Sequence, residues 1–134
     1  MTREEAVRRI ERAADEKLME LDLSGLELEE VPPEIAKCTQ LETLLLARSY
    51  EKKKNKLTKF PDPVLQLTNL KTLNLSHNQI TCIPEAIGQL SNLTQLTLFG
   101  AQITQLPEAI GQLSNLTELD LEYNQITQLP EAFS

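Results

Sequence analysis

Tryptophan is absent from this 134-residue chain, and aromatic residues make up only 4% of it. An aromatic core is therefore excluded, and the 40% of residues that are hydrophobic must build an aliphatic core. Lysine and arginine are also missing after Lys71, and the net charge is −7. We do not expect nucleic-acid binding, because that requires many basic side chains on the phosphates.

Signals for export, membrane insertion and metal binding are lacking as well. No apolar run approaches the ~20 residues that span a membrane, and residues 1–17 lack the apolar stretch of a secretory signal. Cys38 and Cys82 show no metal-ligand spacing, and we expect no disulfide between them. These absences predict a cytoplasmic protein without a membrane association, a metal or another cofactor.

Motifs of enzyme catalysis are missing too. The four glycines form neither a phosphate-binding loop nor a dinucleotide-binding fingerprint. His77 is the only histidine, and no nucleophile or carboxylate stands near it at a triad spacing. Asp120 and Glu122 share one predicted strand face and could hold a cation or a proton, but solvation of the surface is the simpler interpretation. We therefore expect no enzymatic activity.

What the chain does contain is a period of 23 residues. The segment ITCIPEAIGQLSNLTQLTLFGAQ (80–102) is followed directly by ITQLPEAIGQLSNLTELDLEYNQ (103–125). A fixed period of this length predicts a solenoid, in which each unit covers the apolar face of the next. Division at the pattern L-x-x-L-x-L gives five units: 18–40, 41–69, 70–92, 93–115 and 116–134, of which the last is truncated.

Two segments depart from the period. Thr2 and Glu5 have the spacing of a capping box, and apolar residues then recur at helical spacing: Ala6, Val7, Ile10, Ala13 and Ala14. Residues 1–17 are therefore predicted to hold a helix, roughly 3–16, that caps the first unit. The second unit has six extra residues at 49–54, a lysine-rich insertion that we interpret as a solvated loop or, alternatively, as a docking element.

The units carry the signature of a known family. LKTLNLSHNQI (70–80) and LTELDLEYNQI (116–126) match L-x-x-L-x-L-x-x-N-x-L, so residues 18–134 resemble leucine-rich repeats of the 23-residue bacterial type. The resemblance implies an α/β fold, a right-handed solenoid with a parallel β-sheet on its concave face. Turns and short helices, such as PEAIGQL (84–90), are then expected on the convex face.

A narrower resemblance concerns the start of the chain. Residues 4–35, which lead directly into LPEAIGQLSNL-type units, look like the amino-terminal repeat region of bacterial, especially cyanobacterial, Roco-type proteins. In those proteins such repeats precede a GTPase domain, although this sequence contains no G-x-x-x-x-G-K-[S/T] motif. This resemblance implies the sensor arm of a larger signalling protein.

The ninth position of the signature has a structural role. An asparagine amide there can pair with backbone groups of adjoining turns that would otherwise be buried unpaired. Asn55, Asn78 and Asn124 fill the position, whereas Leu26 and Ala101 do not. We expect a water or a local backbone adjustment at Ala101. By their places in the period, Cys38 is predicted to lie in the core and Cys82 to be exposed.

The two copied units differ mainly on the predicted concave face. Of their seven differences, four fall on the five strand positions that should point outward. Convex residues such as Asn92 and Asn115 are identical, although neutral drift should have altered exposed positions there as well. We interpret this contrast as diversification of the concave face for binding; chance in a sample of seven is the alternative.

The concave positions predict a binding site for a protein or a peptide. We expect Arg48 to offer a charge-assisted hydrogen-bond fork and Phe99 and Tyr123 to supply apolar area. Four further residues are expected to tune the fit: Leu45, Asn74, His77 and Asp120. Gly100 is expected to leave a gap among them. The alternative is that Phe99 is exposed without a binding role.

The last residues of the sequence indicate an alternative function. The fifth unit stops at Ser134 without a polar cap, so its apolar residues should form an exposed edge: Leu119, Leu121, Ile126 and Leu129. Such an edge predicts either further repeats or pairing with a second copy. The alternative function is therefore a structural repeat segment that forms a homodimer through this C-terminal edge.

Overall fold

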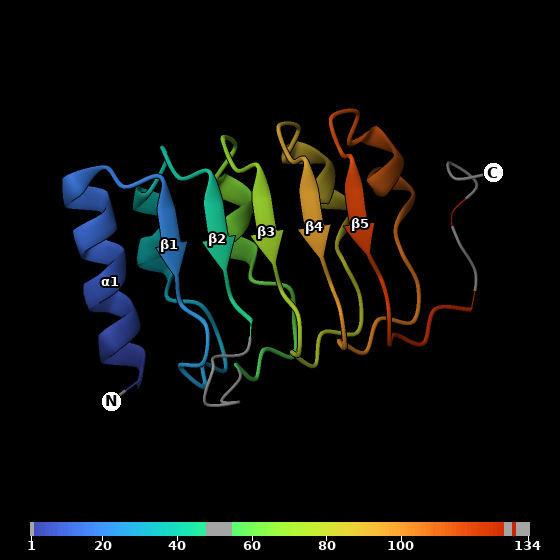
Figure 1. Ribbon diagram of the computed structural model, residues 1–134, viewed down its shortest axis with the longest axis horizontal. Helices are drawn as coiled ribbons and strands as arrows, with labels where there is room; N and C mark the ends of the chain where they lie inside the picture. Colours follow the sequence, from blue (N-terminus) through green and yellow to red (C-terminus); the bar gives the residue numbers. More distant parts are fainter. Residues whose placement is uncertain (1, 48–54, 128–129, 131–134) are drawn as a thin grey trace.

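The computed structural model describes residues 2–47, 55–127 and 130. The helix α1 (Thr2–Glu16) is followed by five strands of one sheet (Figure 1). The strands are β1 (Glu20–Asp22), β2 (Thr43–Leu45), β3 (Thr72–Asn74), β4 (Gln95–Thr97) and β5 (Glu118–Asp120). A 3-10 helix lies between each strand and the next: η1 (Pro33–Lys37), η2 (Asp62–Gln66), η3 (Glu85–Gln89) and η4 (Glu108–Gln112). Within the described ranges, no helix is long and apolar enough to cross a membrane.

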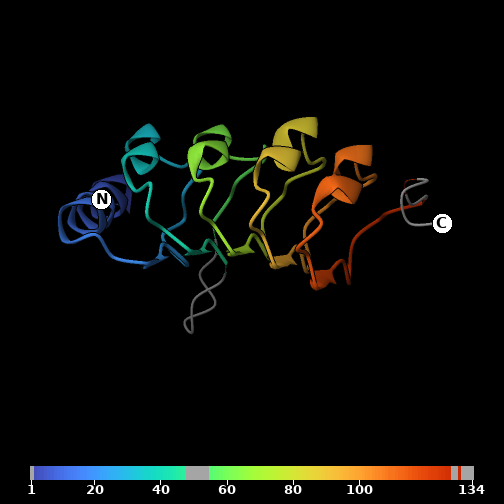
Figure 2. The same ribbon diagram turned by 90° about the horizontal axis from the view of Figure 1, so that it is seen from above.

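The sheet is parallel, and its strands follow the order of the sequence from β1 to β5. Each of β1 to β4 is followed by a return path through a 3-10 helix, and these helices all lie on one side of the sheet (Figure 2). The predicted α/β solenoid with a parallel sheet and short convex helices is therefore confirmed. We call the opposite, solvent-facing side of the sheet the concave face.

The core lies between the sheet and the 3-10 helices. Leu73 and Leu75 are fully buried on the strand side, and Ile87 and Leu90 are fully buried on the return path. The first four units share this arrangement, because alternate strand residues point inward while the helical turn directs its apolar residues back toward them. A buried leucine or isoleucine side chain contributes about 1.5–3 kcal/mol, so the stacked aliphatic columns stabilise the fold without tryptophan.

Helix α1 closes the first coil, as the sequence predicts. Ala6, Ile10 and Ala13 are fully buried against that coil. The Arg9 guanidinium donates to the Asp22 carbonyl oxygen at 2.9 Å, beside the outer strand β1. Gln40 Nε2 donates to the Ala13 carbonyl oxygen at 3.2 Å, near the end of the helix. The helix thus covers an apolar edge and also pairs backbone groups that would otherwise face water.

Asparagines at the ninth position link neighbouring coils. Asn78 Oδ1 accepts the Leu57 backbone N–H at 3.1 Å, and its Nδ2 donates to the Leu46 carbonyl oxygen at 3.0 Å. Asn55 and Asn124 make the equivalent bonds to the coils before them. Because these backbone groups lie in the buried bend, the side-chain amide supplies partners that water cannot. The predicted structural role is confirmed.

The ladder of asparagines is interrupted at Ala101, a buried residue. An asparagine at this position would accept the backbone N–H of Ile80. Among the hydrogen bonds of the described residues, none involves that N–H. The interruption therefore leaves a buried donor without a partner in the part of the protein that the structure describes, which costs stability.

A second ladder runs along the other side of the coil and corrects one interpretation of the sequence. Asn92 Nδ2 donates to the Thr68 carbonyl oxygen at 3.0 Å, and Asn115 Nδ2 donates to the Ser91 carbonyl oxygen at 2.9 Å. These asparagines are exposed but hold consecutive coils together. Their identity in the two copied units therefore has a structural cause, and the expectation that they should drift freely was wrong.

The two cysteines lie as predicted. Cys38 is buried, Cys82 is exposed, and both are free thiols. Cys38 Sγ donates to the Ile10 carbonyl oxygen at 3.5 Å, so it packs between α1 and the first coil. Burial raises the pKa of the Cys38 thiol, because desolvation disfavours the thiolate. Cys38 is therefore a small core residue.

Candidate functional site

The outward positions of the coils line up as columns across the sheet. The register pairs Leu45 with Asn74, Asn74 with Thr97, and Thr97 with Asp120. Backbone hydrogen bonds between neighbouring coils continue beyond the ends of the strands. For example, the His77 N–H donates to the Phe99 carbonyl oxygen at 2.8 Å. The structure therefore brings most of the predicted site residues to the concave face: Leu45, Asn74, His77, Phe99, Asp120 and Tyr123. Arg48 and the insertion 49–54 lie outside the described residues.

Three rings stand in a row on the C-terminal half of this face. The His77 and Phe99 ring centroids are 5.3 Å apart with planes at 62°, and the Phe99 and Tyr123 centroids are 5.0 Å apart at 64°. Both pairs are edge-to-face, a geometry that contributes about 0.5–1.5 kcal/mol beyond simple burial. We call His77, Phe99 and Tyr123 the aromatic row. Its outer member, Tyr123, is 77% exposed.

The eighth position of the coil has a left-handed backbone. Gly25 and Gly100 have φ values of 72° and 68°, and His77 and Tyr123 adopt the same conformation with φ values of 62° and 60°. Glycine adopts this region freely, whereas other residues lose roughly 1–2 kcal/mol there. His77 and Tyr123 therefore occupy positions where glycine would fold more easily, and strain of this kind concentrates at functional sites.

Gly100 does not leave the predicted gap. A Cβ at residue 100 would lie 3.0 Å from His77 Nδ1 and 3.3 Å from His77 Cε1. The imidazole therefore occupies the space that the missing side chain would need, and the expectation of an open gap was wrong. Gly100 instead allows His77 to lie close to the backbone of the next coil.

Asn74 and Asp120 have a structural role that sequence reasoning missed. Asn74 Oδ1 accepts the Ser76 backbone N–H at 3.0 Å, and Asp120 Oδ1 accepts the Glu122 N–H at 3.0 Å. Asp22 makes the same bond in the first coil. The signal in the sequence is an Asn or Asp where the chain leaves a strand, because its side-chain oxygen can accept the backbone N–H two residues later. Both residues thus shape the concave face as well as lining it.

The concave face is acidic along its last strand. Glu118, Asp120 and Glu122 line one shallow hollow, and Gln95 Nε2 donates to Glu118 Oε1 at 3.2 Å. No ion pair joins these three carboxylates to any basic group in the described part of the chain. The same part of the chain has no group of three His, Cys, Asp or Glu that could hold a metal ion. The three carboxylates give this part of the concave face a negative charge.

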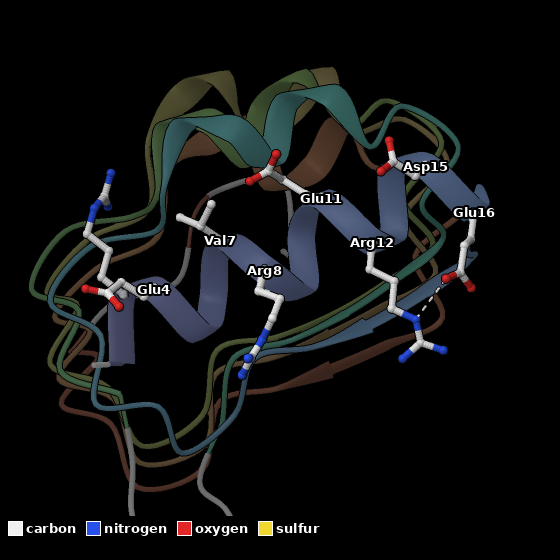
Figure 3. A pocket seen from close by; sticks show the side chains of 8 residues that line it. Glu4, Val7, Arg8, Glu11, Arg12, Asp15 and Glu16 are labelled. Atoms are coloured by element: carbon white, nitrogen blue, oxygen red, sulfur yellow. Dashed lines mark hydrogen bonds and ion pairs between the residues drawn. The ribbon is translucent and has the colours of Figure 1, made fainter.

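A different hollow lies over the outward surface of α1 (Figure 3). Its lining alternates in charge: Arg3, Glu4, Arg8, Glu11, Arg12, Asp15 and Glu16 surround Val7. Arg8 pairs with Glu5, and Arg12 Nε pairs with Glu16 Oε2 at 3.0 Å. Charges that neutralise one another along a helix mainly solvate it. We therefore place the candidate site on the concave face and not here.

Comparisons with known proteins agree with this architecture. The family model "Leucine rich repeat" matches residues 53–103, and the model "Leucine Rich repeats (2 copies)" matches residues 91–133. A comparison with curated proteins finds no match.

Among solved structures, the chain is similar to a leucine-rich-repeat protein of Leptospira interrogans, with a TM-score of 0.69 and 34% sequence identity. That alignment covers 91% of this chain and 36% of the other, so the chain spans about a third of the relative's length. The matches over residues 53–133 and the shared fold together show that the chain is a leucine-rich-repeat protein.

Proposed function

We propose that this chain recognises a protein or peptide through its concave face, with Phe99 and Tyr123 as apolar anchors. Leucine-rich repeats are generally protein–protein interaction modules. The observation that carries the proposal is the aromatic row, whose outer ring remains 77% exposed on a left-handed backbone. The left-handed backbone makes Tyr123 less favourable for folding than the glycine of two other coils, and exposed tyrosines are frequent anchors of interfaces.

The other predicted contact residues keep their places in the proposal. Leu45 on β2 pairs with Asn74 on β3 in the register of the sheet, and Asp120 lies on β5. Arg48 belongs to the same column as His77 by the repeat, so we retain it as a contact residue. The proposal assigns no reaction to the chain, in keeping with a family that is typically non-enzymatic.

The proposal is tested by affinity capture from extract of the source cells. The bait is the full chain, and the test variant is Phe99→Ser/Tyr123→Ser. Met19→Ser/Cys82→Ser is the matched control, because it removes exposed apolar area away from the aromatic row. Circular dichroism must show that all three proteins fold equally. Proteins retained by the original chain and the control but lost from the test variant support the proposal, whereas equal retention by all three contradicts it.

Self-association through the sheet edge is the second candidate function. It is favoured by β5, which is an outer strand of the sheet and is followed by half-buried Leu121 and Ile126. Leu129, predicted for the same edge, lies outside the described residues. Glu118 and Glu122 oppose it, since symmetric pairing of β5 would bring like charges together. Light scattering tests this candidate, and a monomer at high protein concentration would exclude it.

A role as the sensor arm of a larger cytoplasmic signalling protein is a narrower hypothesis. It rests on the resemblance of residues 4–35 to the repeat region of bacterial Roco-type proteins. The test is the coding sequence around this segment in its source genome. A G-x-x-x-x-G-K-[S/T] motif in the same reading frame would support the hypothesis, and a reading frame without one would contradict it.

A further inference from the structure

We propose that the partner presents a basic, extended segment, with an arginine or lysine that crosses Tyr123 and pairs with the carboxylates of β5 and its continuation. This inference rests on the proposed function, because it assigns a chemical class to the partner of the same concave face. Three features of the last two coils carry it: carboxylates that have no ion pair within the described residues, their position beside the aromatic row, and the way the copied units differ.

The first feature is the line of carboxylates formed by Glu118, Asp120 and Glu122. Glu118 and Asp120 are alternate residues of β5, about 7 Å apart on one face, and Glu122 follows in the turn and lines the same hollow, so the three charges repel one another. Four acidic residues of the first two coils and α1 have basic partners, as Glu42 has Lys71 at 3.5 Å. In the described ranges these three have none. A cation from a partner would relieve the repulsion that the fold leaves in place.

The second feature is the contact between this line and the aromatic row. The Gly100 N–H donates to the Glu122 carbonyl oxygen at 3.0 Å, which places Phe99 across the ladder from Glu122. Tyr123 follows in the chain, and its ring packs edge-to-face with Phe99. A guanidinium or ammonium above an exposed tyrosine ring is attracted to its π-face while remaining within reach of a neighbouring carboxylate. Phe99 then supplies apolar contact for the next residue of the segment.

The third feature is the chemistry of the substitutions between the copied units. Gln95, Thr97 and Phe99 of one coil correspond to Glu118, Asp120 and Glu122 of the next. Three neutral residues are thus replaced by three acidic ones, all on the concave face. None of the other four differences between the copies changes a charge. The local charge therefore differs only where a partner would touch the sheet.

The test is selection from a phage-displayed library of short random peptides on the immobilised full chain. The strongest selected peptide is then measured against two variants of equal net charge. Glu118→Gln/Asp120→Asn/Glu122→Gln removes the line of carboxylates and keeps an oxygen acceptor at residue 120. Glu29→Gln/Glu30→Gln/Glu85→Gln removes three exposed carboxylates elsewhere. A third variant, Phe99→Ser/Tyr123→Ser, reports whether binding occurs at the aromatic row.

The inference predicts peptides enriched in arginine or lysine. Binding should weaken about tenfold in the first variant but less than about twofold in the second, and it should also weaken as salt is raised. Replacing the basic residue of the peptide by glutamine should cause a similar loss with the unmodified chain, which keeps the test valid if the first variant misfolds.

Two results would contradict the inference, and only the second of them would also contradict the proposed function. Peptides that depend on Phe99 and Tyr123 but are not basic, and bind both charge variants equally, contradict the basic partner and leave the proposed function standing. Selected peptides that bind the Phe99→Ser/Tyr123→Ser variant unchanged contradict the proposed function and this inference together. Failure to select any peptide has the same consequence for a partner of the extended type.

Discussion

The imidazole of His77 lies against Gly100, so closely that a Cβ at residue 100 would stand 3.0 Å from Nδ1. The backbone of Gly100 is also left-handed, with φ at 68°. The residue thus meets two separate requirements, a conformation that other residues adopt at a cost and a close approach by a ring from the preceding coil. One member of the aromatic row therefore owes its position to the absence of a side chain at residue 100.

Gly100→Ala is expected to lower the free energy of unfolding by about 1–2 kcal/mol and to displace the His77 ring. Gly88→Ala is the matched control. Its Cβ would crowd Oε1 of Gln112, which is at the end of a flexible side chain and can move, and it would make an ordinary contact with Ala109 Cβ at 3.6 Å. Urea unfolding measures both, and equal losses in the two variants would contradict the role assigned to Gly100.

The interrupted ladder offers a gain of stability. Ala101→Asn is expected to raise the free energy of unfolding by about 1 kcal/mol, because the new amide can accept the Ile80 N–H. Ala101→Leu adds volume without an acceptor and should give no such gain. Thermal or urea unfolding separates the two variants, and a stabilising leucine with a neutral asparagine would show that volume, not pairing, is limiting.

Asn78→Ala tests an intact part of the same ladder. The substitution leaves the Leu57 N–H and the Leu46 carbonyl oxygen without their partner, so we expect a loss of about 2–4 kcal/mol. Hydrogen exchange should show faster exchange of the Leu57 amide. A loss below about 1 kcal/mol would mean that water replaces the asparagine easily.

Two serines in equivalent positions should respond differently to alanine. Ser24 Oγ accepts the Ala47 N–H at 2.9 Å, whereas the buried Ser76 Oγ has no partner among the described residues. Ser24→Ala should therefore lower the free energy of unfolding by about 0.5–1.5 kcal/mol, while Ser76→Ala should leave it unchanged or slightly higher. Similar losses from both substitutions would contradict the assignment.

The two thiols should react in separate phases. Cys82 is exposed and should react with a thiol reagent in the native protein, whereas Cys38 should react only as the protein unfolds. Because burial raises the Cys38 pKa, the unfolded thiol ionises first as pH rises, so stability should fall through that range. Cys82→Ser should remove the fast phase alone. A fast phase of two thiols would contradict burial of Cys38.

The sequence predicts those features that the repeat period determines. The leucine spacing specified the sheet, the core and the ladder of asparagines, because each depends on residues at fixed positions within one unit. The His77 contact with Gly100 could not be predicted, since it depends on a rotamer and on the next coil. The hydrogen bonds of Asn92 and Asn115 were missed for a similar reason. Their exposed positions suggested that these residues could vary freely, whereas their side-chain amides donate to carbonyl oxygens of the preceding coil.

Amide chemical-shift mapping with a peptide selected on the full chain locates the contact surface residue by residue. We expect the largest shifts at His77, Phe99 and Tyr123 and along β5. Residues of α1 and of the 3-10 helices η1 to η4 should be almost unchanged. Large shifts confined to the outward surface of α1 or to the 3-10 helices, with the aromatic row unaffected, would contradict recognition through the concave face.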